Sequence, residues 1–290
     1  MVTLILKNDF NREINIFWYY INNKDDLYHK KLIFNYFVDL EDKLRNIHDE
    51  VEAKNILRNY ILSFRQINHD KIKKIEKLIE QQTIFVGNII IDNLTNLMNY
   101  KFSDNHNGYI ITPVILPFSP FKGNTFFYSL NKLLKSTDLD SLDLLIVLAH
   151  EMSHFLLFDK LKEQTFNNDC KMTDNELYFL KEILAVLIIR SRELVQWLKT
   201  EKYEGNMLLR FLYVKENNNI KLISDYFNEL YTKHIENGLN FDLFLIDMIK
   251  KIKYISSELN EKIKIWNQYG AEREKYIDQI IKYKYPIEIK

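Results

Sequence analysis

One stretch of this sequence constrains the fold more than any other. Residues 142–158 predict a helix that is apolar on nearly every side, with the sequence HEMSH in its middle. Such a helix has to be largely buried. Burying two histidines and a glutamate in it is costly unless they are paired or bound to a metal ion. We therefore expect His150, Glu151 and His154 to form a polar site inside the core.

The same stretch has the spacing of an HExxH motif. Residues four apart on a helix lie one above the other on one face, so both imidazoles can reach one metal ion. Zinc is the usual ion, because it binds neutral histidine nitrogens at about 2.0–2.1 Å. Glu151 lies one step round the helix, where it can act as a general base on a metal-activated water. The alternative is a buried helix whose histidines and glutamate only hydrogen-bond to neighbours; we favour the metal site.

A catalytic zinc needs a third protein ligand, which leaves the fourth position for water. The longer pattern HExxHxxGxxH is excluded, because position 157 is leucine and position 160 is lysine. The remaining candidates are the acidic residues that follow the motif: Asp159, Glu163, Asp169, Asp174, Glu176 and Glu182.

Two of these glutamates differ in how the sequence explains them. Glu176 closes the run TDNE, which predicts a capping box at the start of a helix. Glu182 falls in mid-helix before the apolar run ILAVLII, where an uncompensated carboxylate is costly. A metal ion would compensate it, and the small Ala185 would let the two helices approach closely. The alternative is an ion pair with Lys181 or Lys162. We favour Glu182 as the ligand, followed by Glu176.

The HEMSH sequence, followed by Glu182 and Ala185 in an E-x-x-A pattern on a later helix, resembles the zincin metallopeptidases, specifically their glutamate-liganded gluzincin branch. The pattern is similar to several compact intracellular zincins, including the family that cleaves phage-type repressors. The resemblance covers about forty of the 290 residues and assigns no subfamily. It implies a zinc ion bound by His150, His154 and Glu182. It also implies that Glu151 is the general base.

The resemblance further implies a substrate that lies extended along an edge strand beside the motif helix. Residues 108–116 predict a strand just upstream of that helix. Pro113 inside this strand favours an edge position, because proline cannot donate to the hydrogen-bond ladder. An ordinary core strand is the alternative.

The expected chemistry is hydrolysis of a peptide bond. Zinc lowers the pKa of a bound water towards about 7. Glu151 takes the proton of this water, and later returns it to the leaving amine. The developing oxyanion needs a further donor. Tyr231 and His234, three apart on one expected helix, could serve together. Tyr178 and Tyr269 are other candidates, and plain packing is the alternative for each of the chain's 18 tyrosines.

Composition limits the other classes of function. Of the 290 residues, 47% are hydrophobic, which is ample for a sizeable core. Basic and acidic residues balance at 40 each, so nothing indicates a nucleic-acid surface. Cys170 is the only cysteine, so no intrachain disulfide can form. The first residues lack a signal-peptide core, and no apolar run reaches the roughly 18–20 residues that span a bilayer. We expect a cytoplasmic protein without a membrane partner, of undetermined oligomeric state.

The predicted fold class is α+β and predominantly helical. We expect a zincin-like catalytic core with a small mixed sheet and an edge strand, plus an N-terminal helical bundle. The expected division is 1–100, N-terminal strands and helices, and 101–290, the zincin-like catalytic region; a single compact unit is the alternative. Strands are expected at residues 2–6, 14–20 and 108–116, with a strand or helix start at 124–130. Helices are expected at residues 25–51, 52–67, 70–98, 141–161, 173–198, 207–214, 220–235 and 241–266.

The expected function is that of a zinc-dependent peptidase acting on peptides or proteins. Two alternatives stay open. One is a non-catalytic module in which zinc braces a helical scaffold that binds a partner. The other is a metal-dependent hydrolase of a non-peptide bond. An intact Glu151 argues against the first alternative, because a purely structural site needs no base and favours a fourth protein ligand.

Overall fold

The computed structural model describes residues 4–24, 26–101, 108–135, 141–163, 166, 170–206, 208–268 and 286–288. Contacts divide the chain into two compact units. Unit 1 comprises Met1–Asn88 and Asn105–Leu144, and unit 2 comprises Ile89–Asp104 and Leu145–Lys290. Each unit draws on both sides of residue 100. The expected division into residues 1–100 and 101–290 stays a prediction. A catalytic role for residues 101–290 stays a prediction.

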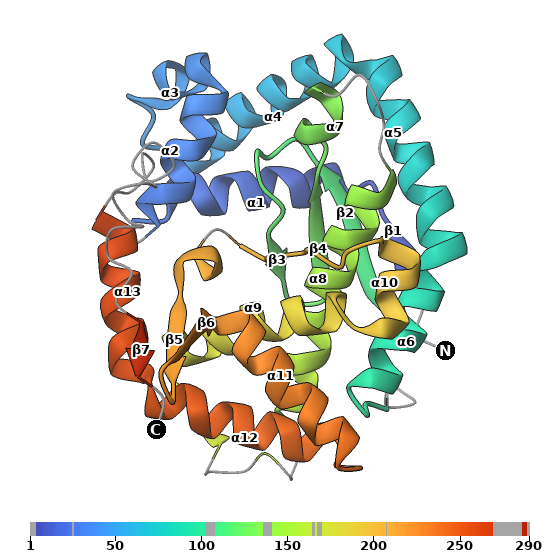
Figure 1. The fold of residues 1–290 in the computed structure, drawn as a ribbon. Coiled ribbons are helices and arrows are strands. Elements are labelled where there is room, and N and C mark those ends of the chain that lie inside the picture. Colours follow the sequence, from blue (N-terminus) through green and yellow to red (C-terminus); the bar gives the residue numbers. More distant parts are fainter. Residues whose placement is uncertain are drawn as a thin grey trace. The chain divides into compact units, whose positions relative to one another are not determined.

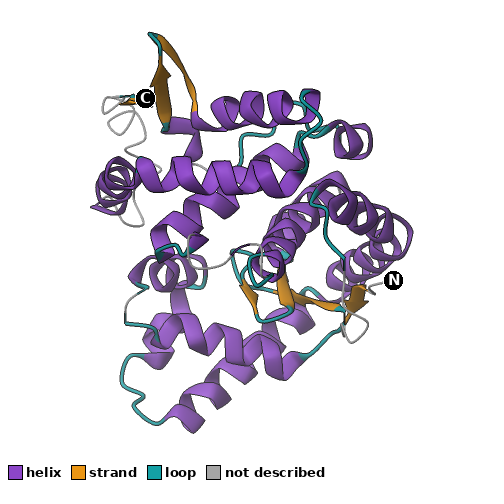
Figure 2. Ribbon diagram, turned by 90° about the horizontal axis from the view of Figure 1, so that it is seen from below, coloured by secondary structure: helices purple, strands orange, loops and turns teal. Residues whose placement is uncertain are grey.

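Helices form most of the described chain, and its strands are confined to two small sheets (Figure 2). A four-stranded sheet belongs to unit 1, and a three-stranded sheet belongs to unit 2. This composition confirms the α+β, predominantly helical class. The zincin-like character of the core stays a proposal. No described helix is both long enough and apolar enough to cross a membrane.

Unit 1 combines its sheet with helices that pack on one another (Figure 1). The strands are β1 (Leu4–Leu6), β2 (Tyr109–Val114), β3 (Phe121–Lys122) and β4 (Thr125–Ser129). The helices are α1 (Phe10–Asn22), α2 (Leu27–Tyr36), α3 (Val38–Leu44), α4 (Glu50–Ile67), α5 (His69–Gln82) and α7 (Asn131–Lys135), with a π-helical turn, η1, at Thr83–Gly87. α1 contacts both α2 and α4, and α4 also contacts α3 and α5.

α1 occupies the place of the strand expected at residues 14–20, so that prediction was wrong. The isoleucine, tyrosine and phenylalanine residues of this stretch favour a strand locally. Asp9 instead caps a helix, because its side chain accepts a hydrogen bond from a backbone N–H three residues on, at 3.1 Å. Ile14, Phe17 and Ile21 then lie on one helical face, and all three are buried.

The single helix expected at residues 25–51 is divided into α2 and α3, and a non-helical link separates α3 from α4. The division falls at Phe37, whose backbone leaves the helical region with φ −115° and ψ 71°. Leu40 and Leu44 of α3 are buried, whereas Val51, at the end of the expected helix, is 67% exposed. The helix expected at residues 70–98 is likewise interrupted by η1.

β2 confirms the strand expected at residues 108–116, but the edge position was wrong. The strand order is β1-β2-β4-β3, so β2 pairs in parallel with β1 on one side and β4 on the other. Pro113 is tolerated because its nitrogen faces the β1 side, beyond Ile111, the last residue paired with β1. The Pro113 carbonyl accepts a hydrogen bond from Arg65 at 2.9 Å. The edges of this sheet are β1 and β3.

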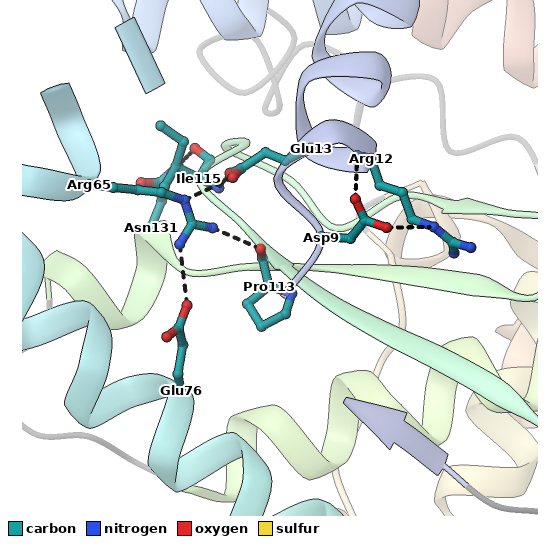
Figure 3. Close-up of polar contacts among 8 residues, drawn as sticks. All are labelled: Asp9, Arg12, Glu13, Arg65, Glu76, Pro113, Ile115 and Asn131. Atoms are coloured by element: carbon teal, nitrogen blue, oxygen red, sulfur yellow. Dashed lines mark hydrogen bonds and ion pairs between the residues drawn. The ribbon is translucent and has the colours of Figure 1, made fainter. Parts of the chain in front are cut away.

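A polar network ties α1, α4 and α5 to the segment that follows β2 (Figure 3). Arg65 on α4 donates to Glu13 on α1 at 2.8 Å and to Glu76 on α5 at 3.2 Å. Glu13 is 1% exposed and also accepts a hydrogen bond from the Ile115 N–H at 2.7 Å. The Asn131 side chain donates to the Ile115 carbonyl. Burial raises the pKa of Glu13 above its ordinary value, although the charge of Arg65 opposes this.

Unit 2 is built around α9 (Asp174–Ile189), which contacts α10 (Arg192–Leu198), α11 (Ile223–Glu236) and α12 (Phe241–Tyr254) (Figure 1). Most residues of α9 are buried, which explains its nearly continuous apolar sequence. α13 (Ser256–Gln268) and the 3-10 turn η4 (Leu209–Phe211) also belong to unit 2. So do all but the first residues of α6 (Asn88–Leu97) and α8 (Ser141–Lys160), since unit 1 includes Asn88 and Ser141–Leu144. The sheet has the order β6-β5-β7, with β5 at Tyr213–Glu216, β6 at Asn219–Leu222 and β7 at Ile287–Glu288.

Three expected helices of unit 2 differ from the structure. The helices expected at residues 173–198 and 241–266 are each divided, into α9 and α10 and into α12 and α13. The helix expected at residues 207–214 was wrong, because η4 and β5 take its place. β5 and β6 form a hairpin across Asn217 and Asn218, both with positive φ (48° and 66°). Asparagine tolerates this conformation in two-residue turns, so the hairpin follows from the turn residues.

Candidate metal centre

α8 and α9 bring three predicted ligands together within unit 2. His150 and His154 lie one turn apart on α8, with ring centroids separated by 4.5 Å. Glu182 lies on α9, and its carboxylate reaches both rings. Oε2 is 3.4 Å from His150 Nε2, and Oε1 is 3.6 Å from His154 Nε2. The HExxH spacing sets the positions of the histidines, while the packing of the two helices supplies the carboxylate.

These three side chains form a donor set that could hold a metal ion. One ligand atom from each lies within 4.8 Å of the others. The set is enclosed, since His154 is buried and Glu182 is only 6% exposed. Two imidazole nitrogens and one carboxylate are the protein donors of several three-ligand zinc sites, and the same donors also suit other transition metals.

The alternative partner of Glu182 is present as well. Lys181 Nζ lies 2.8 Å from Glu182 Oε1, so the ion pair considered from the sequence does form. The other oxygen, Oε2, faces His150 Nε2. Oε2 is therefore available to a metal ion while Oε1 keeps its contact with Lys181.

The side chains of the cluster differ in the direction in which their pKa values are shifted. Burial, together with the nearby His150, lowers the pKa of His154 to about 3, although contact with Glu182 opposes this shift. Burial would lower the pKa of His150 as well, but contact with Glu182 and the charge of Glu151 raise it above its ordinary value. Burial of Glu182 would raise its pKa, yet the contacts with His150 and His154 hold it well below the ordinary value. His154 is thus neutral and Glu182 ionised, as metal ligands have to be.

Glu151 lies beside this cluster. Its Oε2 atom is buried and has no hydrogen-bond partner among the described residues. Burial raises the pKa of Glu151 to about 7, although the charges of His150 and Lys181 oppose the rise. A carboxyl group with a pKa near neutrality can both accept and return a proton, as a general base in hydrolysis must.

Other acidic candidates for the third ligand have partners of their own. Glu176 accepts a hydrogen bond from the Thr173 N–H at 2.8 Å, while the Thr173 hydroxyl accepts one from the Glu176 N–H at 3.3 Å. This is the expected capping box at the start of α9. Asp159 forms an ion pair with Lys162 at 2.7 Å. Asp169 lies outside the described residues.

Tyr231 and His234 lie on α11, where their surroundings are apolar. Tyr231 packs on Phe244 with 5.0 Å between ring centroids, and it lines a small cavity with Leu184 of α9. Leu184 is on the face of α9 opposite Glu182, because each residue turns a helix by about 100°. His234 packs on the same phenylalanine at 5.7 Å. The structure does not bring this pair to the cluster, so their expected role as oxyanion donors has no geometric support.

A different tyrosine reaches the cluster. The Tyr203 hydroxyl lies 3.0 Å from His150 Nδ1, while His150 Nε2 faces Glu182. Burial, together with the carboxylates of Glu182 and Glu151, raises the pKa of Tyr203 above its ordinary value. The phenol is therefore neutral near pH 7. Tyr203 lies in the loop between α10 and η4, where no periodic pattern distinguishes it from the other tyrosines.

Two tyrosine candidates from the sequence remain, Tyr178 and Tyr269. Tyr178 lies on α9, and its hydroxyl accepts a hydrogen bond from the Asn206 side chain at 2.9 Å. Tyr269 lies outside the described residues.

Comparison of the chain with protein-family models, with curated proteins and with solved structures finds no match. The residues of the cluster themselves fit a zinc ion. A buried carboxylate meets two imidazoles, and an adjacent glutamate presents a buried oxygen that lacks a partner among the described residues. Each of these groups would be costly to bury without compensation.

Proposed function

We propose that this protein is a zinc-dependent peptidase of the zincin type, with the two histidines of α8 and Glu182 of α9 as its metal ligands. The observation that carries the proposal is the approach of one carboxylate to both histidines of HEMSH, at 3.4 and 3.6 Å. Glu182 was favoured from the sequence by its apolar mid-helix position, by Ala185 and by the E-x-x-A pattern, none of which determines how α8 and α9 pack. Its position beside both histidines is therefore independent support.

The residues around the ion have distinct tasks. A zinc ion bound here would act as a Lewis acid that polarises a peptide carbonyl and makes a water molecule more acidic. Glu151 takes the proton of the attacking water, because its pKa of about 7 suits proton exchange near neutrality. Glu151 then returns this proton to the nitrogen of the leaving amine. The buried helices α8 and α9 hold the ligands in place, so little reorganisation accompanies the reaction.

The proposed substrate is a peptide or a protein. Binding along β2 is no longer part of the proposal, because β2 is paired on both sides. We also propose a cytoplasmic location, supported by the single cysteine, Cys170.

The proposed function is tested by Glu151→Gln, which keeps the shape of the side chain but cannot accept a proton. We expect zinc content equal to that of the wild type and a fall in peptide turnover of at least about 100-fold. Asp159→Asn, an acidic residue of the same helix outside the cluster, is the matched control and should leave both quantities unchanged. Zinc is measured by elemental analysis, and cleavage of a peptide mixture is followed by mass spectrometry.

Each outcome of this experiment has a clear meaning. Zinc-loaded wild type that cleaves no peptide would contradict the peptidase and favour a zinc-braced binding module. Equal turnover by wild type and Glu151→Gln would remove Glu151 from the mechanism. Hydrolysis of esters or non-peptide amides alone, lost in Glu151→Gln, would indicate a non-peptide hydrolase.

A further inference from the structure

The loop between α10 and η4 delivers one side chain to the candidate metal centre. α10 ends at Leu198, and its C-cap, Lys199, has a φ of +52° that turns the chain sharply. The loop then runs back past the C-terminal end of α9. At its centre, the Tyr203 hydroxyl lies 3.0 Å from Nδ1 of His150. Among the described residues, this is the hydrogen-bond contact found for that nitrogen.

The end of α9 holds this loop through its backbone. The Thr200 hydroxyl donates to the Ile189 carbonyl at 2.9 Å. Arg190, the C-cap of α9, donates from Nε to the Tyr203 carbonyl at 2.5 Å. Its other arm donates from Nη1 to Asp225 of α11 at 2.7 Å. The guanidinium is therefore anchored on both sides, and the backbone of Tyr203 is fixed to helices of the same unit.

Close packing fixes the next part of the loop. Gly205 has a φ of +74°, and a Cβ atom added there would lie 2.5 Å from Val186 Cγ2 of α9. Only a glycine allows the backbone to pass so close to this helix. Asn206 then donates to the Tyr178 hydroxyl at 2.9 Å. Because Tyr178 and Val186 flank Glu182 along one face of α9, the loop packs on the face that carries the third ligand.

We propose that Tyr203 is a positioning residue, whose hydroxyl oxygen accepts a hydrogen bond from His150 Nδ1–H and so presents His150 Nε2 to the metal ion. A neutral imidazole carries one proton, and the partner of one nitrogen decides that the other offers its lone pair. The partner here is a neutral phenol. Unlike a carboxylate, it adds no negative charge to a site that already holds Glu182 and Glu151. This inference rests on the proposed zinc-binding function.

The first test compares two partly buried tyrosines of unit 2. Tyr203→Phe removes only the hydroxyl behind His150, and we expect zinc affinity to fall by about 10- to 100-fold, as is usual for partners of ligating histidines. Tyr231→Phe is the control, because the Tyr231 ring packs on Phe244 and lies at the face of α9 opposite Glu182. This variant should change zinc affinity by less than about twofold. Affinity is measured by competition with a chelator of known strength. Equal affinities for wild type and Tyr203→Phe would overturn the inference.

The second test moves the loop but keeps the hydroxyl. Gly205→Ala puts a methyl group against Val186, so the loop has to shift, and zinc affinity should fall by about 10-fold or more. Gly238→Ala is the matched control. Gly238 has a similar φ of +68° but no atom within 4 Å of an added Cβ, so it shares the backbone strain without the collision. Its zinc affinity should equal that of the wild type.

A measurement on the wild type requires no variant. In the zinc-loaded protein, long-range proton–nitrogen correlations should show His150 with a proton on Nδ1 and zinc on Nε2. Coordination of His150 through Nδ1 would overturn the role of Tyr203 even if zinc binds. Absence of zinc binding by the wild type would instead contradict the proposed function, so the two failures are distinguishable.

Discussion

At the end of the motif helix, a buried lysine forms an ion pair with a partly exposed carboxylate. Lys160 on α8 is fully excluded from solvent, and its Nζ atom lies 2.7 Å from Asp242 Oδ1 of α12. It also donates to the Asn99 carbonyl at 2.9 Å. Lys160→Met keeps the apolar stem but leaves Asp242 without its cation. We expect the free energy of unfolding, measured by urea denaturation, to fall by about 3 kcal/mol.

Lys162→Met is the matched control for this prediction. Lys162 forms an ion pair of the same length with Asp159, but its side chain is 75% exposed. Exposed pairs contribute only about 0–1 kcal/mol. Equal losses in the two lysine variants would contradict the importance of burial. Partial recovery of stability on adding Asp242→Asn to Lys160→Met would assign the loss to the unpaired carboxylate.

Residues of the centre could be predicted where spacing or burial alone determines their chemistry. The spacing of four places His150 and His154 on one face, and the cost of a carboxylate in mid-helix singled out Glu182. Tyr203 could not be predicted, because its position depends on how a loop packs against α9, which no local pattern encodes. The spacing of three correctly placed Tyr231 and His234 on one helix. Spacing does not indicate which element the face that carries them contacts.

At the scale of elements, the predictions of helices and strands were correct where local propensity and tertiary packing favour the same structure. α8 and β2 were predicted within a few residues, because their apolar patterns and their burial coincide. In α1, β-favouring residues conflict with the cap at Asp9 and with an apolar spacing of three and four, and the helix prevails. At Pro113, the expected break in pairing was real. This break affects only the side of β2 that faces β1, beyond the last residue paired with β1. β2 is therefore still a central strand.

The network around Glu13 yields a prediction about α1 and α4. Arg65→Met removes the cation that faces this buried carboxylate at 2.8 Å, and we expect a loss of about 3–5 kcal/mol in the free energy of unfolding at pH 7. Burial already raises the pKa of Glu13 in the folded protein, and Arg65 opposes that rise. Without Arg65 the pKa of Glu13 in the folded protein rises further. The variant therefore loses stability as the pH increases from the ordinary pKa of a glutamate through this raised pKa. The loss should therefore shrink as the pH approaches 4.5, the ordinary pKa of a glutamate.

Urea denaturation of wild type and Arg65→Met at pH 7 and pH 5 checks this prediction. Arg58→Met is the control, since Arg58 also lies on α4 but makes an exposed contact with Asn11. It should cost little at either pH. Adding Glu13→Gln to Arg65→Met should recover stability at pH 7, because a neutral amide avoids the buried charge. A loss that does not depend on pH would contradict the account of Glu13.

At the scale of the whole molecule, two discontinuous units separate two kinds of polar cluster. The network around Glu13 and Arg65 belongs entirely to unit 1, and the candidate metal centre belongs entirely to unit 2. This division could not be predicted from the sequence, because each unit combines segments from both sides of residue 100. The fold class could be predicted, since hydrophobic periodicity and composition are read directly from the sequence.

We propose that three residues of unit 2, His150, His154 and Glu182, bind one zinc ion. The most direct test is the zinc content per chain of the wild type, of Glu182→Ala and of Glu176→Ala, prepared side by side and measured by elemental analysis. Glu176→Ala is the control, because Glu176 is the other glutamate favoured as a ligand but serves the capping box of α9. We predict about one zinc ion per chain in the wild type and in Glu176→Ala, and almost none in Glu182→Ala. Wild type that stays free of zinc after zinc is supplied, or Glu182→Ala that binds as much as wild type, would contradict the claim.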